Sequence, residues 1–226
     1  MKEKKITPRS ILTSILADDI QNASLRLKKV RQITSESFLL PELDGPRREI
    51  CNCYVIGAYS ACITLTNHLL ERYCKELLLT VEFGNPFLRA GSSSNKTAPP
   101  DLSQYLNKDL SATLSACKTK GLLSKQDWKI FDKYKEIFRN GFSHYDPPKI
   151  LQGGTYGFSL LGVDGATTEV KGIKIQDGSM AALAINMFAE RNAWPYLATV
   201  ENFMRSTIRY FHNPKIDPGL PTVPYE

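Results

Sequence analysis

The 226-residue chain lacks the short motifs that most often mark a catalytic or cofactor-binding site. It contains no glycine-rich phosphate-binding loop, no His-Glu-x-x-His zinc motif, no Gly-x-Ser-x-Gly nucleophile motif and no conspicuous pair of carboxylates. Its three histidines, His68, His144 and His212, are far apart, and none has another histidine or a cysteine at ligand spacing beside it. We therefore expect neither a metal ion nor a cofactor.

The cysteines are too few and too irregularly spaced for a disulfide framework. There are five of them, an odd number, and no two form a Cys-x-x-Cys pair. Cys51 and Cys53 are two residues apart, so a helix turns their side chains to different sides. We interpret all five as reduced thiols, which are typical of a cytoplasmic protein, and not as zinc ligands.

No apolar run is long enough to give a clean membrane span. The most apolar stretch, Tyr54 to Leu70, contains Asn67 and His68. The N-terminal residues include lysines but no unbroken apolar segment of the kind found in a signal peptide. We expect a soluble cytoplasmic protein that does not contact a membrane, with Tyr54 to Leu70 forming a buried helix.

The overall composition is that of an ordinary globular protein with a surplus of basic residues. Hydrophobic residues make up 42% of the chain and charged residues 23%, and the net charge is +6 with a pI of about 9.0. A positive field favours contact with phosphates and other anions. A soluble protein that is basic without any such partner has the same composition, so charge alone does not decide the function.

Apolar residues recur at helical spacing through most of the first 150 positions. The predicted helices run from Ile11 to about Phe38, Arg47 to about Val81, Asp101 to about Lys120, and Ser124 to about His144. A break at Pro41, Gly45 and Pro46 separates the first two helices, and residues 84–100 are predicted to form a long mobile loop. Ser124 and Asp127 form a capping box at the start of the last helix, and Pro147 ends it.

The character of the chain changes after residue 150. Residues 151–176 contain short β-branched runs separated by turn pairs, which predict a small β-hairpin. Residues 178–212 return to helical spacing, with Pro195 expected to kink or divide the helix, and the proline-rich tail 213–226 is expected to be extended. The predicted fold is a single all-α domain over residues 1–226, with an N-terminal helical extension at 1–45, core helices at 46–150 and a late hairpin.

One histidine stands close to an arginine where the fourth predicted helix ends, in the stretch Ile137 to Lys149. Arg139 and His144 are five residues apart, about 140° around an α-helix, and a long arginine side chain can close that gap where Gly141 loosens the helix. Asn140 and His144 are four residues apart, so the Asn140 amide can orient the imidazole or contact a substrate.

Arginine and histidine together have the chemistry needed to cleave RNA without a metal ion. The arginine holds the charge on a phosphoryl group, and the histidine moves a proton to or from the reacting oxygens. The alternative is structural: His144 interacts favourably with the negative end of the helix, and Arg139 is a solvated surface cation. The spacing by itself does not separate these two interpretations.

The segment Phe138 to His144, FRNGFSH, resembles the signature of the HEPN superfamily (higher eukaryotes and prokaryotes nucleotide-binding). That signature is an arginine, a polar residue that is often asparagine, three variable residues and a histidine, and it matches Arg139, Asn140 and His144. The resemblance covers roughly Arg47 to Asp146 and includes a long amphipathic helix upstream of the motif. It implies an all-α HEPN-like bundle.

The resemblance also implies an activity and partners. HEPN ribonucleases are metal-independent endoribonucleases that leave 2′,3′-cyclic phosphate and 5′-hydroxyl ends. They are usually homodimers with a composite active site, and they act as toxins or in phage defence, with an antitoxin or regulatory partner. The alternative within the same resemblance is a non-catalytic module that binds nucleic acid, a nucleotide or a protein. A purely structural helical protein is a third interpretation.

The family pattern assigns roles to the matching residues of this chain. Arg139 is expected to hold the phosphate and the transition-state charge, His144 to act as general acid and base, and Asn140 to position them. Ser143 and Tyr145 are weaker candidates for substrate contact. Toxins of this family often carry a tyrosine two positions after the histidine, where this chain has Asp146. His68, with Glu71 three residues on, is interpreted as a core histidine outside the site.

Overall fold

The computed structural model describes residues 8–38, 40–84, 105, 107–144, 146–152, 155–161, 167–174 and 178–208. For residues 8–18, 41, 143, 155–161, 167–174 and 178–180 it describes the backbone alone. The loop expected at 84–100, apart from Gly84, and the tail expected at 213–226 lie outside these residues.

Helices make up most of the described chain, as the sequence predicts. In chain order the elements are α1 (Pro8–Ser35), α2 (Pro41–Val55), α3 (Tyr59–Phe83), α6 (Leu110–Thr119), α7 (Lys125–Tyr134), the π-helix η1 (Lys135–Gly141), α8 (Phe142–His144), α9 (Pro147–Leu151), β1 (Thr155–Leu161), β2 (Thr167–Lys174) and α10 (Gly178–Thr207). None of the helices in the described part of the chain is long and apolar enough to cross a membrane.

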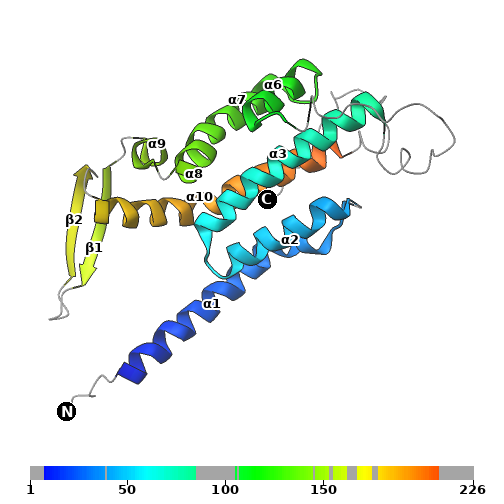
Figure 1. The fold of residues 1–226 in the computed structure, drawn as a ribbon. Coiled ribbons are helices and arrows are strands. Elements are labelled where there is room, and N and C mark those ends of the chain that lie inside the picture. Colours follow the sequence, from blue (N-terminus) through cyan, green and yellow to red (C-terminus); the bar gives the residue numbers. More distant parts are fainter. Residues whose placement is uncertain are drawn as a thin grey trace, which may run out of the picture.

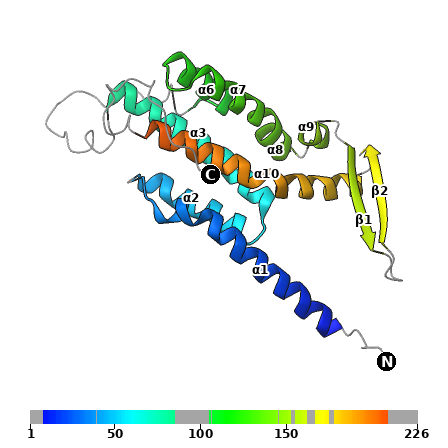
Figure 2. The ribbon, with the colours of Figure 1, turned by 180° about the vertical axis from the view of Figure 1, so that it is seen from behind.

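Two long helices, α3 and α10, lie side by side through the centre of the bundle (Figure 1). On one side of this pair lie α6, α7 and α8, and on the other lies α2, on which α1 packs. The first half of α1 extends away from the bundle, and so does the start of α10 with the two strands, as the view from behind also shows (Figure 2). These projecting segments leave the same end of the molecule.

The helix predicted from Arg47 to about Val81 is two helices in the structure. Because a proline at the first helical position loses no backbone hydrogen bond, α2 begins at Pro41 and contains Gly45 and Pro46, where the sequence predicted a break. The chain turns after α2 at Gly57, whose φ of +81° lies in the left-handed region that glycine favours. The break between helices therefore lies between Val55 and Tyr59, and not at Pro41 to Pro46.

The two strands that follow α9 form an antiparallel pair. Thr155 lies opposite Lys174, and Leu161 lies opposite Thr167. After the strands, α10 continues as one helix through Pro195 to Thr207.

A buried ion pair joins α2 to α10 beside the end of α1. The Arg47 guanidinium donates from Nε to Glu201 Oε1 at 2.8 Å and from Nη2 to Glu201 Oε2 at 2.9 Å. It also donates to Asp44 and to the Ile33 carbonyl, and it lies 3.9 Å from the centroid of the Phe38 ring. Both partners are almost completely buried, at 3% and 0% side-chain exposure. The pair fixes three segments that are distant in the sequence.

The cysteines take no part in cross-links. All five are free, and all but Cys53 are buried. Burial raises the pKa of the Cys51 thiol and of the Cys62 thiol to about 12, so both stay protonated at neutral pH. Protonated buried thiols are poor nucleophiles, and they behave here as small apolar core residues.

Removing one partner of the Arg47–Glu201 pair is expected to destabilise the fold strongly. Arg47→Met leaves the Glu201 carboxylate buried without its partner, which costs about 3–5 kcal/mol in systems of this kind. The double variant Arg47→Met/Glu201→Leu is expected to lose less than the sum of the two single variants. Urea unfolding of the four proteins measures the coupling, with Arg48→Met as an exposed control expected within about 0.5 kcal/mol of wild type. Strict additivity would contradict the pairing.

Candidate functional site

The motif residues lie at the end of a continuous helical rod that runs from Lys125 to His144. Its start is capped as the sequence predicts, because Ser124 Oγ accepts from the Asp127 N–H at 3.0 Å and donates to Asp127 Oδ2 at 2.6 Å. The rod changes from α-helix to π-helix at Lys135 and returns to α-helix at Phe142. It ends at His144, where Pro147 led us to expect the end.

The π-helical segment changes the spacing between the two candidate catalytic residues. In a π-helix the backbone N–H of one residue bonds the carbonyl five residues before it. Two residues five apart are therefore separated by a smaller angle around the helix axis than the roughly 140° of an α-helix. Arg139 lies within the π-helix, and His144 follows one short turn after it. Among the described hydrogen bonds and ion pairs none joins these two side chains directly. Single π turns in α-helices occur often at functional sites.

The Asn140 amide holds Arg139 and not His144. Its Oδ1 accepts from Arg139 Nη1 at 3.2 Å, and its Nδ2 donates to Glu136 Oε2 at 3.1 Å. Glu136 also pairs with Lys135 at 3.2 Å. The hydrogen bond from Asn140, followed by that from Lys135, lowers the pKa of the Glu136 carboxyl. The expected contact of Asn140 with the imidazole is therefore replaced by a chain from Glu136 through Asn140 to Arg139.

His144 is exposed at the end of the rod, and an acidic residue lies close to it. Asp146 caps α9, with its side chain accepting from the Lys149 N–H and pairing with Lys149 Nζ at 3.0 Å. The hydrogen bond from the Lys149 side chain contributes most to lowering the pKa of Asp146, and the charge of His144 adds to it. Asp146 thus begins a helix in this chain.

Gly141 lets α9 approach the motif closely. A Cβ on Gly141 would lie 2.7 Å from Ile150 Cγ1 and 3.4 Å from the Ile150 backbone nitrogen. The Asp146 N–H donates to the Gly141 carbonyl at 2.9 Å across the same turn. Both Gly141 and Ile150 are buried. The glycine between Arg139 and His144 is thus required by packing.

A buried asparagine of α3, Asn67, forms a hydrogen bond with the backbone of the π-helical segment. Asn67 Nδ2 donates to the Phe138 carbonyl at 3.2 Å, and Asn67 Oδ1 accepts from the Tyr196 hydroxyl at 2.8 Å. The Tyr196 ring packs on Phe138 with centroids 4.5 Å apart. These contacts join α3, η1 and α10 at Phe138, the residue before Arg139. Sequence reasoning missed both residues, although an amide within an apolar helical stretch is a signal for a buried hydrogen bond.

Two neighbouring residues of α3, Asn67 and His68, differ in burial. His68 is exposed, so its interpretation as a core histidine is wrong, and Asn67 is the buried polar residue. Glu71 forms a surface pair with Lys75 at 2.7 Å. Of the weaker candidates, the Ser143 side chain and all of Tyr145 lie outside the described residues, as does His212.

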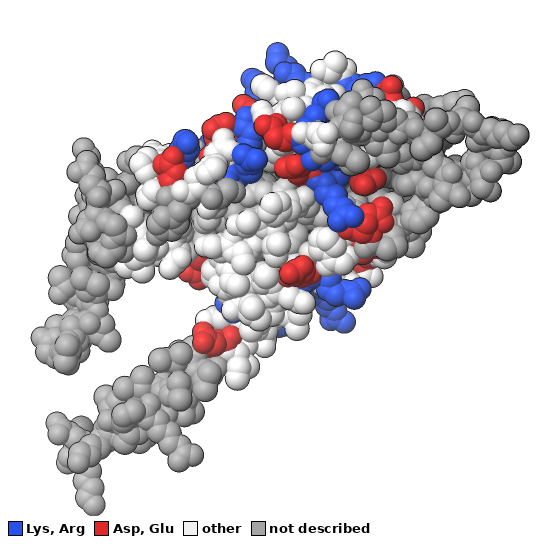
Figure 3. Space-filling view, viewed as in Figure 1, with Lys and Arg blue, Asp and Glu red and all other residues white. Residues whose placement is uncertain are grey.

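Charges of both signs surround the motif. Lys and Arg lie interspersed with Asp and Glu along α6 and α7, on the face shown in Figure 3. Lys135 pairs with both Asp132 and Glu136, so part of the positive charge near Arg139 is already compensated. Among the described residues no three His, Cys, Asp or Glu side chains gather closely enough to hold a metal ion.

Three hollows lie on the described surface. Two adjoin each other between α3 and α10, and one lies between the end of α1 and α2. Arg139, Asn140 and His144 line none of these three. Phe142, between Asn140 and His144, lines one of the two hollows between α3 and α10.

Comparison of the chain with protein-family models, with curated proteins and with solved structures finds no match.

Filling the space at Gly141 is expected to displace α9 from the rod. Gly141→Ala places a methyl group against Ile150, and overpacking of this kind costs about 1–3 kcal/mol. Adding Ile150→Ala removes the opposing atom and is expected to recover part of the loss. Denaturant unfolding measures both variants.

Gly45→Ala is the matched control, because a Cβ there meets nothing within 4 Å and alanine is the better helix former. We expect this control to be neutral or stabilising. A Gly141→Ala protein as stable as wild type would show that α9 does not depend on the close approach.

Proposed function

We propose that this protein is a metal-independent endoribonuclease of the HEPN type, acting as a toxin or in phage defence. The observation that carries the proposal is the Arg139 guanidinium, which the Asn140 amide holds at the exposed end of the rod that also ends in His144. Arginine is suited to holding a phosphate, and histidine, five residues further on in this chain, is the side chain that most often transfers protons in catalysis. The sequence resemblance and the predominantly helical fold are consistent with this reading.

The proposed reaction uses these groups, a second histidine and the RNA itself. The ribose 2′-hydroxyl attacks the adjacent phosphorus, its proton passes to a neutral His144, and Arg139 neutralises charge on the non-bridging oxygens. The bond from phosphorus to the 5′-oxygen breaks, and that oxygen receives a proton from a protonated histidine. The products are a 2′,3′-cyclic phosphate and a 5′-hydroxyl. A homodimer with two motifs in one composite site would supply both histidines.

Three features of this chain support roles for the neighbouring residues. Glu136 orients the Asn140 amide so that its oxygen is directed to Arg139. Asp146 lies near His144 and begins α9, so regulation through a tyrosine at that position is not part of the proposal. Asn67 holds the backbone of the rod one residue before Arg139. RNA is the proposed substrate, and an antitoxin or regulator is the proposed partner.

The proposal predicts RNA cleavage that continues in excess EDTA and depends on the motif. His144→Ala and Arg139→Ala are each expected to reduce the rate at least about 100-fold, because general acid–base catalysis and charge stabilisation each contribute factors of that order. His68→Ala and Lys133→Ala are matched controls, since both residues are exposed and outside the motif, and their rates are expected to equal wild type.

Two results would overturn the enzyme proposal. Loss of cleavage in EDTA would exclude the metal-free mechanism. Salt-sensitive RNA binding without turnover, unchanged by His144→Ala, would instead indicate the non-catalytic binding module.

A further inference from the structure

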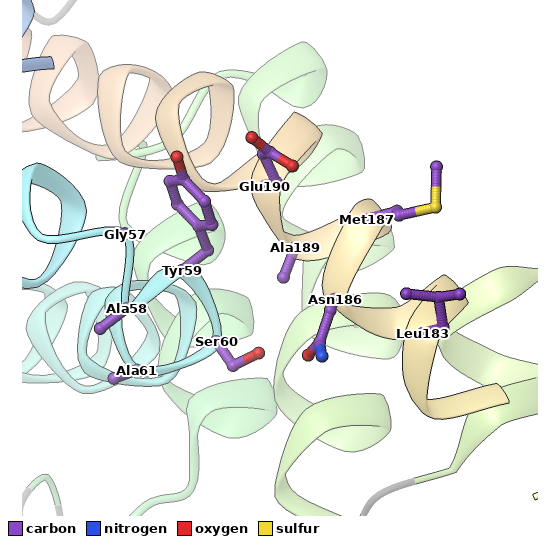
Figure 4. A pocket seen from close by; sticks show the side chains of 10 residues that line it. All are labelled: Gly57, Ala58, Tyr59, Ser60, Ala61, Leu183, Asn186, Met187, Ala189 and Glu190. Carbon is purple, nitrogen blue, oxygen red and sulfur yellow. The ribbon is translucent and has the colours of Figure 1, made fainter. Parts of the chain in front are cut away.

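A groove runs between the beginning of α3 and the first half of α10. Its two adjoining parts have volumes of about 580 Å³ and 510 Å³, and both are lined by Ser60, Ala61 and Asn186. Figure 4 shows Ser60 and Asn186 pointing toward each other across the first part. Small residues, Gly57, Ala58, Ser60, Ala61 and Ala189, line much of this part. A helix backbone can approach such a surface closely.

The groove has apolar walls, and two carboxylates belong to its lining. Leu183, which is 41% exposed, lines one part, and Leu65 and Phe142 line the other. The charged residues among the lining side chains are Glu49 and Glu190, and both are exposed. An apolar helix face flanked by lysine or arginine has the matching chemistry.

The first helix of the same chain presents such a face. Ile20 is 68% exposed and Leu27 is 54% exposed, and their separation of seven residues places them on one side of α1. Lys28 and Arg31 are exposed as well, and Arg31, four residues after Leu27, lies on the same side of the helix. Leucines at positions 12 and 16 continue the same spacing in the sequence.

The position of α1 in its own chain keeps this face free. Arg26 donates from Nε to the Val55 carbonyl at 2.8 Å and from Nη1 to the Tyr59 hydroxyl at 3.1 Å, which anchors α1 at the rim of the groove. Val30 and Ile33 are buried in the bundle, whereas the first half of α1 extends beyond it (Figure 1).

We propose that α1 of a second copy docks in this groove, with Ile20 and Leu27 against its apolar walls and Lys28 and Arg31 near Glu49 and Glu190. Each copy offers both surfaces, so a two-fold axis lets each chain give one helix and receive the other. The occupied groove includes Phe142, two residues before His144, so assembly contacts the segment that carries the motif. The docking goes beyond RNA cleavage and does not rest on it.

Sedimentation velocity of the full chain tests the docking. Wild type is expected to be a dimer at tens of micromolar protein, and Ile20→Glu/Leu27→Glu and Ala61→Arg are each expected to be monomers. Ala61 is an exposed helical residue that lines both parts of the groove, so a long cation there blocks the groove and repels the basic residues of α1. Leu25→Glu is the control. Leu25 is 52% exposed but lies on the opposite side of α1, so this variant is expected to remain a dimer.

A charge exchange makes the test specific to this pair of surfaces. Lys28→Glu/Arg31→Glu and Glu49→Lys/Glu190→Lys are each expected to weaken self-association, because like charges then face each other. An equimolar mixture of the two is expected to form a mixed dimer, since both of its helix–groove contacts pair opposite charges. Circular dichroism verifies that each variant is folded. A monomeric wild type, a dimer that survives Ile20→Glu/Leu27→Glu, or a mixture that stays monomeric would overturn the proposal.

Discussion

The Asn67 side chain is the contact on which the architecture around the motif depends. Its amide connects the Phe138 carbonyl of the π-helix to the Tyr196 hydroxyl, and all three groups are buried. A buried polar group without a partner costs about 1–3 kcal/mol. If Asn67 were turned away, its own amide, the Phe138 carbonyl and the Tyr196 hydroxyl would all lose a hydrogen bond. This requirement fixes the rotation of the rod on α3 and α10, and with it the side of the bundle on which Arg139 emerges.

Local rules predicted much of the fold, and distant contacts account for what they missed. Ser124 as a cap and the end of the rod at His144 follow from hydrogen-bonding and steric rules that act within a few residues. The π-helix and the burial of Asn67 in place of His68 involve partners about seventy or more positions away, which helical spacing does not identify. Adjacent positions on a helix differ by about 100°, so a small error in the assigned face exchanges an exposed residue for a buried one.

Packing and proposed chemistry meet in the same short segment. Gly141 is required by the approach of Ile150, and Asp146 begins α9, so two residues beside the catalytic candidates have structural roles. The groove proposed to receive α1 reaches the segment at Phe142. In this account the rod is contacted by Asn67, by Ile150 of α9 and by the α1 helix of a second copy. The proposed activity and the proposed assembly are linked through the rod.

The ends of the RNA products test the proposed chemistry most directly. A defined oligoribonucleotide is incubated with the full-length protein in EDTA, and the masses of the fragments are measured. The account predicts a 2′,3′-cyclic phosphate on the upstream fragment and a 5′-hydroxyl on the downstream fragment, with no cut where the nucleotide before the scissile bond is 2′-deoxy. A 5′-phosphate product, or cleavage after a 2′-deoxy nucleotide, would contradict attack by the 2′-hydroxyl and the roles given to Arg139 and His144.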